Sequence, residues 1–261
     1  MRTRVIPAVA LAALALGVHG ANAQDFDWSG RIDQGRTIEV KGVNGEIRAS
    51  AASGDQVTVT ATLEEGRRGS ADDIRFEVLE HGDGVTICAV YPTPDSSRRD
   101  NECAPGDDGR MNTRDNDVKV NFEVQVPTGV RFAGRTVNGR VSASSLSSDV
   151  EAYTVNGSIR VSAAGLVRAS TVNGSVDVSM GRADWTDELE IETVNGGITI
   201  AFTDDLNAEV RASTVNGSIS SDWPLTVRGR FSPKRLSGTV GDGGRTLTLG
   251  TVNGDIELRR R

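Results

Sequence analysis

The protein has 261 residues, of which 25% are charged, 37% hydrophobic and only 4% aromatic, and its formal net charge is −7. A single all-β domain can reach this length, and the chain is long enough to bury a substantial core. The acidic balance excludes the basic surface expected of a nucleic-acid-binding protein, and it disfavours electrostatic docking onto anionic lipids.

Residues 1–23 have the pattern of a secretory signal peptide. Arg2 and Arg4 form a positive start, residues 5–18 are mostly apolar, and Ala21-Asn22-Ala23 is a small-x-small cleavage site before Gln24. The apolar stretch is too short to cross roughly 30 Å of hydrocarbon. We therefore expect an exported protein, periplasmic, secreted or at the cell surface, without a membrane span.

Two cysteines, Cys88 and Cys103, are predicted to form a disulfide. Export places them in an oxidising compartment. Cys88 ends a β-like run, and Cys103 lies in a loop rich in Pro, Asp and Arg at residues 92–117. Closing a loop of about 15 residues stabilises a fold by roughly 3 kcal/mol in the chain-entropy model. The spacing is not that of a catalytic or metal-binding C-x-x-C pair.

A short repeat dominates the second half of the chain. The tetrapeptide Thr-Val-Asn-Gly recurs, and Gly42-Val43-Asn44-Gly45 is a further copy near the start. The segment 236–240 fits as a degenerate copy with Ser237 in the Asn position, which makes seven units between residues 130 and 258. The turn asparagines are Asn44, Asn138, Asn156, Asn173, Asn195, Asn216 and Asn253.

Alignment of the units on Asn predicts which positions are buried. The residues six before Asn are all apolar, and those three after it are all β-branched, while the positions between alternate polar and apolar as in a half-buried strand. Each unit is therefore predicted to be strand, Asn-Gly turn, strand. We assign the Asn-Gly pairs a structural role, since both residues tolerate the positive φ of a tight turn.

Two all-β architectures fit this unit. In an antiparallel hairpin meander, equivalent positions lie about 10 Å apart, whereas in a β-solenoid with one Asn-Gly turn per coil they stack about 4.8 Å apart. The column five residues before Asn alternates in sign through Glu151, Arg168, Glu190 and Arg211, and Arg160 falls beside Asp177 in another column. Such pairing stabilises only close neighbours, which favours the solenoid.

The repeated Thr-Val-Asn-Gly-x-Ile/Val coil, together with the segments 38–47 and 54–59, resembles the bacterial Toastrack family of adhesin-like domains, a domain of unknown function. The resemblance covers roughly residues 30–258. It implies a right-handed, single-stranded β-helix and a role in adhesion, envelope scaffolding or stress sensing, with no catalytic residues. We expect an irregular N-terminal part at 24–129, with a disulfide-clipped loop at 92–117, and regular coils of the same domain at 130–261.

No catalytic, cofactor-binding or metal-binding residues are predicted. His81 lies in a turn signal and is expected to be exposed. The predicted function is therefore a non-enzymatic module that binds an envelope or cell-surface component, protein or glycan. Two alternatives remain open: a polysaccharide-active β-helix enzyme, and a calcium-stabilised extracellular module that uses acidic loops such as Asp107-Asp108 and Asp115–Asp117.

Overall fold

The computed structural model describes residues 26–261, apart from residues 115, 187, 226 and 229–233. The described part is almost entirely β-structure, and its one helical element is the short 3-10 turn η1 (Ala71–Asp73). The all-β prediction is thereby confirmed. The signal peptide predicted at residues 1–23 lies outside the described residues. In the part that is described, no helix is long and apolar enough to cross a membrane.

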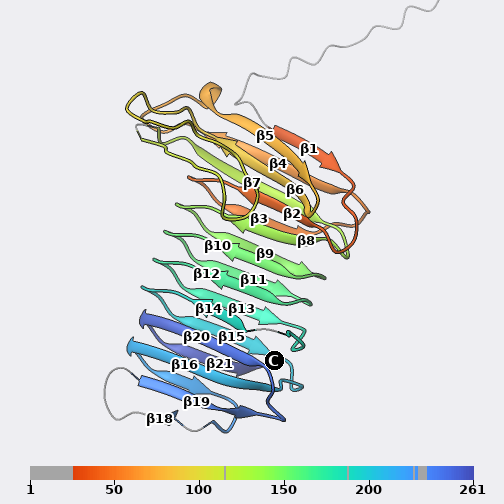
Figure 1. Ribbon diagram of the computed structural model, residues 1–261, viewed down its shortest axis with the longest axis vertical. Coiled ribbons are helices and arrows are strands. Elements are labelled where there is room, and N and C mark those ends of the chain that lie inside the picture. Colours follow the sequence, from red (N-terminus) through yellow and green to blue (C-terminus); the bar gives the residue numbers. More distant parts are fainter. Residues whose placement is uncertain (1–25, 115, 187, 226, 229–233) are drawn as a thin grey trace, which may run out of the picture.

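The strands form two sheets, which we call sheet A and sheet B (Figure 1). Sheet A contains, in spatial order, β1 (Phe26–Gly30), β4 (Val57–Glu64), β7 (Lys119–Val126), β3 (Ile47–Ala51), β9 (Val141–Leu146), β11 (Ile159–Ala163), β13 (Val176–Met180), β15 (Ile198–Phe202), β21 (Ile256–Arg260) and β17 (Ile219–Ser221). Sheet B contains β18 (Val227–Arg228), β19 (Lys234–Val240), β16 (Ala208–Asn216), β20 (Thr246–Asn253), β14 (Leu189–Glu192), β12 (Val167–Ser170), β10 (Val150–Tyr153), β8 (Arg131–Arg135), β2 (Thr37–Lys41), β6 (Gly84–Val90) and β5 (Arg75–His81).

Strands β8 to β15 form the regular middle of the stack. Each Thr-Val-Asn-Gly turn leads from a strand of sheet B to the next strand of sheet A, and equivalent strands of successive coils pair in parallel. Strands joined by such a turn therefore lie in different sheets. The hairpin meander, in which they would pair with each other, is wrong, and the sequence repeat becomes a stack of coils in space.

The solenoid prediction holds only in part, because the ends of the stack depart from a single-stranded helix. The first coil in sequence, β2 and β3, lies between β6/β7 and β8/β9. The last coil, β20 and β21, is likewise inserted between β14/β15 and β16/β17, as Figure 1 shows for the blue strand β20. Antiparallel strands complete both ends, so both sheets are mixed.

The predicted degenerate coil at residues 236–240 is wrong. This segment belongs to β19, which pairs antiparallel with β16, and Ser237 lies opposite Arg211 instead of in the Asn column. The physical reason is the open edge of β16. Its backbone groups need partners, and an antiparallel return of the chain supplies them directly.

The core fills the space between the two sheets, as the column pattern predicts. Each buried aliphatic side chain contributes roughly 1.5–3 kcal/mol before entropy is subtracted. Phe231, one predicted member, lies outside the described residues, and Ile219 near the end of the stack is only partly buried. The buried residues six before the turn asparagines are Phe132, Val150, Val167, Leu189, Val210 and Leu247, and those three after them include Val141, Ile159, Val176, Ile198 and Ile256.

Candidate functional site

The seven predicted turn asparagines form one continuous ladder along an edge of the stack. The side-chain amide nitrogen of each asparagine except Asn44 donates to the amide oxygen of its neighbour at 2.7–2.8 Å, and Asn44 accepts at the end of the ladder. The spatial order is Asn44, Asn138, Asn156, Asn173, Asn195, Asn253 and Asn216. Asn253 therefore lies between Asn195 and Asn216, because the last coil is inserted between its neighbours. Ladders of this kind stabilise stacked strands, which gives these residues a structural role.

The turn glycines are required for a reason other than the one expected. Of the seven, Gly45 alone has a positive φ, at 123°. At Gly139, Gly157, Gly174 and their equivalents, a Cβ would overlap the carbonyl oxygen of the turn glycine in the neighbouring coil. The constraint is therefore the close approach of stacked backbones. The buried Thr154 shows the same closeness, since its hydroxyl donates to the Gly139 carbonyl oxygen at 2.9 Å.

The charge columns behave differently from one another. Arg160 and Asp177 lie opposite each other in β11 and β13 and form an ion pair at 3.5 Å. Glu151 and Arg168 also lie opposite each other, in β10 and β12, but no ion pair joins them. The alternation predicted to continue through Glu190 and Arg211 is wrong, because the inserted strand β20 places Thr248 between them.

A polar cleft of about 370 Å³ opens on the outer face of sheet B. Its floor includes Ala133 of β8, which lies between Glu39 of β2 and Glu151 of β10 in the strand register. The neighbouring coils carry long charged side chains at this position, so the small side chain of Ala133 leaves a hollow. Pro105 and Gly106, from the loop at 92–117, line the cleft as well.

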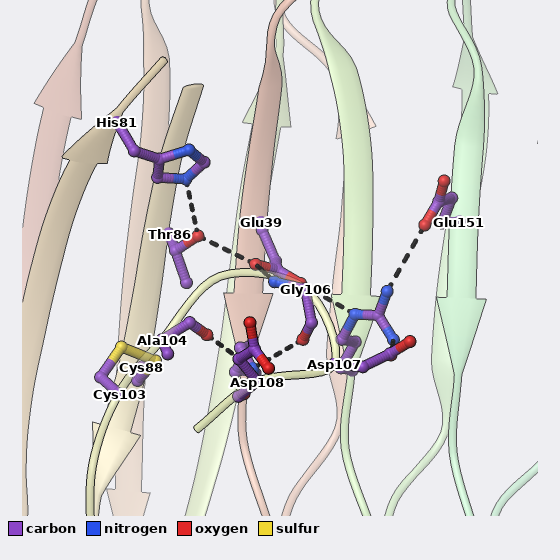
Figure 2. A network of polar contacts seen from close by, with 12 residues as sticks. Glu39, His81, Thr86, Cys88, Cys103, Ala104, Gly106, Asp107, Asp108 and Glu151 are labelled. Carbon is purple, nitrogen blue, oxygen red and sulfur yellow. Dashed lines mark hydrogen bonds and ion pairs between the residues drawn. A yellow bond between two sulfur atoms is a disulfide. The ribbon is translucent and has the colours of Figure 1, made fainter. Parts of the chain in front are cut away.

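Glu39 and Arg135 form the centre of a hydrogen-bond network beside this cleft (Figure 2). Glu39 is only 5% exposed, and its Oε1 accepts from Nε of Arg135 at 2.8 Å. Its Oε2 accepts from the Thr86 hydroxyl and from the Gly106 backbone N–H, both at 2.9 Å. A buried carboxylate needs such a set of partners, because an unpaired buried charge is strongly destabilising.

Arg135 connects the sheet to the loop and to the next coil. Its guanidinium pairs with Asp107 at 2.7 Å and with Glu151 at 3.5 Å, and it lies 4.2 Å from the centre of the Tyr153 ring. Burial, with the charge of Glu151, raises the pKa of the Tyr153 hydroxyl. Because the guanidinium lies over the Tyr153 ring, the face of the ring toward Arg135 is already occupied by a cation.

The loop at 92–117 is fixed to sheet B at two further points. Lys41 donates its ammonium protons to the carbonyl oxygens of Ala104, Gly106 and Asp108 at 2.7–2.8 Å, and burial lowers its pKa. Cys88 of β6 and Cys103, the pair expected to be bonded, form a disulfide with a Cα–Cα distance of 5.8 Å. Together these contacts hold Gly106 against the cleft.

His81 is half-buried, whereas we expected it to be exposed. Because the Thr86 hydroxyl donates to Glu39, Nε2 of His81 donates to that hydroxyl, at 3.0 Å. The backbone N–H of Asp83 donates to Nδ1 of the same ring at 3.3 Å. Thr86 is fully buried, so this arrangement does not present an accessible nucleophile; it orders one wall of the cleft.

Two of the acidic side chains considered for calcium, Asp107 and Asp117, contact protein groups. Asp107 pairs with Arg135, and the two carboxylate oxygens of Asp117 accept backbone N–H groups of Arg67 and Arg68 at 3.2 and 2.9 Å. These hydrogen bonds lower the pKa of Asp117. Within the described residues, which do not include Asp115, three or more His, Cys, Asp or Glu side chains nowhere gather as metal ligands.

Comparison with known families identifies the fold family. The family model described as Toastrack DUF4097 matches residues 105–259, more than half of the chain. The chain belongs to the Toastrack family. The match confirms the resemblance deduced from the Thr-Val-Asn-Gly repeats, and it includes both the regular coils and the inserted C-terminal coil of this Toastrack protein.

Two solved structures resemble it more distantly. One, described as "a putative cell adhesion protein" from Clostridium sporogenes, is 9% identical with a TM-score of 0.44 and covers 91% of this chain and 100% of its own. The other, "a putative adhesin" from Bacteroides fragilis, is 10% identical with a TM-score of 0.36 and covers 90% and 97%. Neither similarity is close enough to transfer a function. No curated protein matches the sequence.

His81, Glu151 and Arg168 of the cleft were considered in the sequence, but Glu39, Ala133 and Arg135 were not, although a signal was present. Glu39 and Ala133 occupy the same column, five residues before Asn, as Glu151 and Arg168. Extended to the first two coils, that column contains one apolar residue, Ala133, between charged ones. Its meaning depends on which coils are neighbours, and the insertion of β2 next to β8 is a property of the tertiary structure.

Proposed function

We propose that this Toastrack protein is an exported, non-enzymatic module that binds a component of the bacterial cell envelope or cell surface. Membership of the family over residues 105–259 carries the proposal, because the family resemblance implies an envelope-associated role in adhesion or scaffolding. The predicted signal peptide supports export. The Cys88–Cys103 disulfide supports an oxidising compartment, since such bonds persist outside the cytosol.

The stack of coils suits a rigid binding surface. Main-chain pairing runs without interruption from β5 to β18 in sheet B, and the asparagine ladder adds a second row of hydrogen bonds. Rigid surfaces lose little conformational entropy on binding. We propose that the outer face of sheet B, together with the loop at 92–117, forms the contact surface. The cleft over Ala133 lies on that surface, between Glu39 of β2 and Arg168 of β12.

We further propose that residues 24–129 and 130–261 are two parts of one domain. Pairing of β2 with β8 and of β3 with β9 across residue 129 supports this organisation. The right-handed path of the coils, implied by the family resemblance, belongs to the same proposal.

Co-sedimentation tests the function directly. Residues 24–261 are mixed with fractionated envelopes of the source cell, with and without a chelator, and heat-denatured protein serves as the control. We expect saturable binding of the folded protein to one fraction, unchanged by the chelator. Absence of binding to every fraction would contradict the proposal, and turnover of an envelope polysaccharide would favour the enzyme instead. Loss of binding in chelator would favour the calcium-dependent module.

A further inference from the structure

In the cleft over Ala133, most of the carboxylates already have partners within the protein. Two of the guanidiniums, in contrast, have no ion-pair partner among the described residues. Glu39 accepts from Arg135, Thr86 and Gly106, so all its strong contacts lie within the protein. Asp149 accepts the backbone N–H of Leu166 at 2.9 Å and lies 3.7 Å from Arg182. Two of the acidic groups in the cleft are therefore neutralised internally.

Glu151 and Glu190 are the register neighbours of Arg168, on β10 and β14. Glu151 pairs with Arg135 at 3.5 Å. Glu190 lies on the same exposed face of β14 as Glu192, two residues away. Within the described part of the chain, no ion pair reaches Arg168, although carboxylates occupy the equivalent positions on both neighbouring strands.

Arg131 supplies a second guanidinium to the same cleft. It lies two residues before Ala133 in β8, and it donates to the carbonyl oxygen of Gly35. No carboxylate pairs with it among the residues that the structure describes. The charged groups left for a ligand are thus two guanidiniums, Arg131 and Arg168, against one carboxylate, Asp83.

The other residues that line the cleft indicate which groups a ligand carries besides its anionic group. Both donors and acceptors line the cleft, among them the Thr37 hydroxyl and the carboxylates of Asp83 and Glu151. Hydroxyl groups both donate and accept, so a polyhydroxylated ligand can satisfy such a lining. A flat heterocycle is disfavoured, because the Tyr153 ring beside the cleft is covered by Arg135. The volume of about 370 Å³ lies within the roughly 300–1,000 Å³ range of small-ligand sites.

We propose that this cleft binds the carboxylate-bearing ring of an acidic saccharide, with Arg131 and Arg168 as the anion-binding residues. The inference deepens the proposed envelope-binding function and rests on it. A planar carboxylate matches the guanidinium fork, and such charge-assisted hydrogen bonds are about twice as strong as neutral ones. The sugar hydroxyls contact Asp83, Thr37 and Glu151.

Titration of the whole protein, monitored by NMR so that millimolar affinities are measurable, tests the ligand class. The probes are glucuronate, glucose and inorganic phosphate, of which the first two differ only in the carboxylate. We expect saturable binding of glucuronate and at least tenfold weaker binding of glucose and phosphate. Equal binding of glucose would overturn the role of the guanidiniums, and equal binding of phosphate would overturn the saccharide.

Two variants locate the site. Arg168→Gln is expected to weaken glucuronate binding about tenfold or more, whereas Arg160→Gln on the opposite sheet leaves it unchanged. Ala133→Leu fills the floor of the cleft and is expected to abolish binding while the amide spectrum of the other coils is retained. Unchanged affinity in both cleft variants would place the ligand elsewhere and overturn the proposal.

The same variants separate this proposal from the envelope-binding function. If wild type binds neither saccharide but still co-sediments with one envelope fraction, the cleft assignment fails and the function stands. If glucuronate binds to the cleft but no fraction retains the protein, the envelope function fails while the cleft assignment stands. Loss of co-sedimentation in Ala133→Leu supports both together.

Discussion

The middle of this solenoid and its ends solve the problem of strand pairing in different ways. From β8 to β15 the four coils that follow one another in sequence are also neighbours in space, paired in parallel and with one turn tetrapeptide each. At both ends the order in space departs from the order in sequence, because the first and last coils are inserted between their neighbours. The middle repeats one local solution, whereas the ends combine segments that are distant in the chain.

The ends also carry the antiparallel strands. A stack of coils leaves two open sheet edges at each end, which can pair with other chains and cause aggregation. Here β4, β1 and β5 complete one end, and β19 and β18 complete the edge of sheet B at the other. A repeat therefore specifies how a stack grows but not how it stops.

The largest effect is expected from removing the inserted coil. In a sequential solenoid, loss of the last coil would only shorten the stack, but here it would remove β20 and β21 from between β14/β15 and β16/β17. A chain ending at Arg245 is expected to lose protection from hydrogen exchange in β16, β17 and β19, while β8 to β13 remain protected. Retained protection at residues 208–221 would show that this end folds without the insertion.

A single methyl group at a turn tests the close contact between coils. Gly174→Ala is expected to destabilise the protein by about 3 kcal/mol or more, because its Cβ would overlap the Gly157 carbonyl oxygen in a coil that has neighbours on both sides. Gly217→Ala should cost less, since β17 is the edge strand of sheet A and can shift outward. Urea unfolding measures both changes.

Gly54→Ala is the control for these turn variants. A Cβ there meets nothing within 4 Å, so the expected change is within about 0.5 kcal/mol. Equal losses at Gly174 and Gly217 would show that the end coil is held as rigidly as the middle.

Removal of the disulfide tests the N-terminal end. The double variant Cys88→Ser/Cys103→Ser is expected to lose about 3 kcal/mol of stability, given a sequence separation of 15 residues. Hydrogen exchange should accelerate in the loop at 92–117, whose carbonyl oxygens hold Lys41, but not in β11 to β15. The same pattern in the reduced wild type is the matched control, and acceleration throughout the stack would contradict a local role.

Variants of the asparagine ladder compare the middle of the stack with its end directly, with smaller expected losses of stability. Asn173 exchanges side-chain hydrogen bonds with both Asn156 and Asn195, so Asn173→Ala is expected to cost roughly 1–2 kcal/mol. Asn216 ends the ladder and bonds to Asn253, so Asn216→Ala should cost about half as much. Thermal unfolding of the two variants checks the ratio, and a larger loss at Asn216 would contradict the ladder as the source.

The smallest effect concerns Glu192, at the junction of the regular stack and the inserted coil. Burial, with the charge of Glu190, raises its pKa, so the folded state retains this proton to a higher pH than the unfolded state does. Stability should therefore fall slightly as pH rises from the ordinary carboxyl pKa through the raised one, and remain lower above it. Glu192→Gln should remove that decrease in pH-dependent melting, whereas Glu257→Gln, a control outside this pair, should not.

Much of the fold could be predicted from particular residues. The apolar columns on either side of Asn predicted the coil, and the pairing of Arg160 with Asp177 predicted its parallel register. The reason given for the turn glycines was wrong, since their backbone is needed for close approach and not for positive φ, except at Gly45. That distinction depends on where the neighbouring coil lies, which a single repeat does not contain.

The candidate site was less accessible to sequence analysis. Glu39, Lys41 and Arg135 were overlooked because their partners are far away in the chain, and Arg135 lies 96 residues from Glu39. His81 was expected to be exposed, but the β5–β6 hairpin places its ring beside Thr86. The pairing of β6 with β2 then places Thr86 beside Glu39, 47 residues away. Contacts of this kind have no local pattern that a sequence could reveal.

The amino-acid sequence by itself determined the repeated coil, because period-two burial and the Thr-Val-Asn-Gly turn act between residues that are close in the chain. Only the tertiary structure decided the order of the coils, the closure of the ends and the cleft over Ala133. These depend on which strand finds an open edge, and parallel edges with the same register are equivalent as far as local sequence is concerned. The hollow at Ala133 exists because β2, a strand from the start of the chain, became its neighbour.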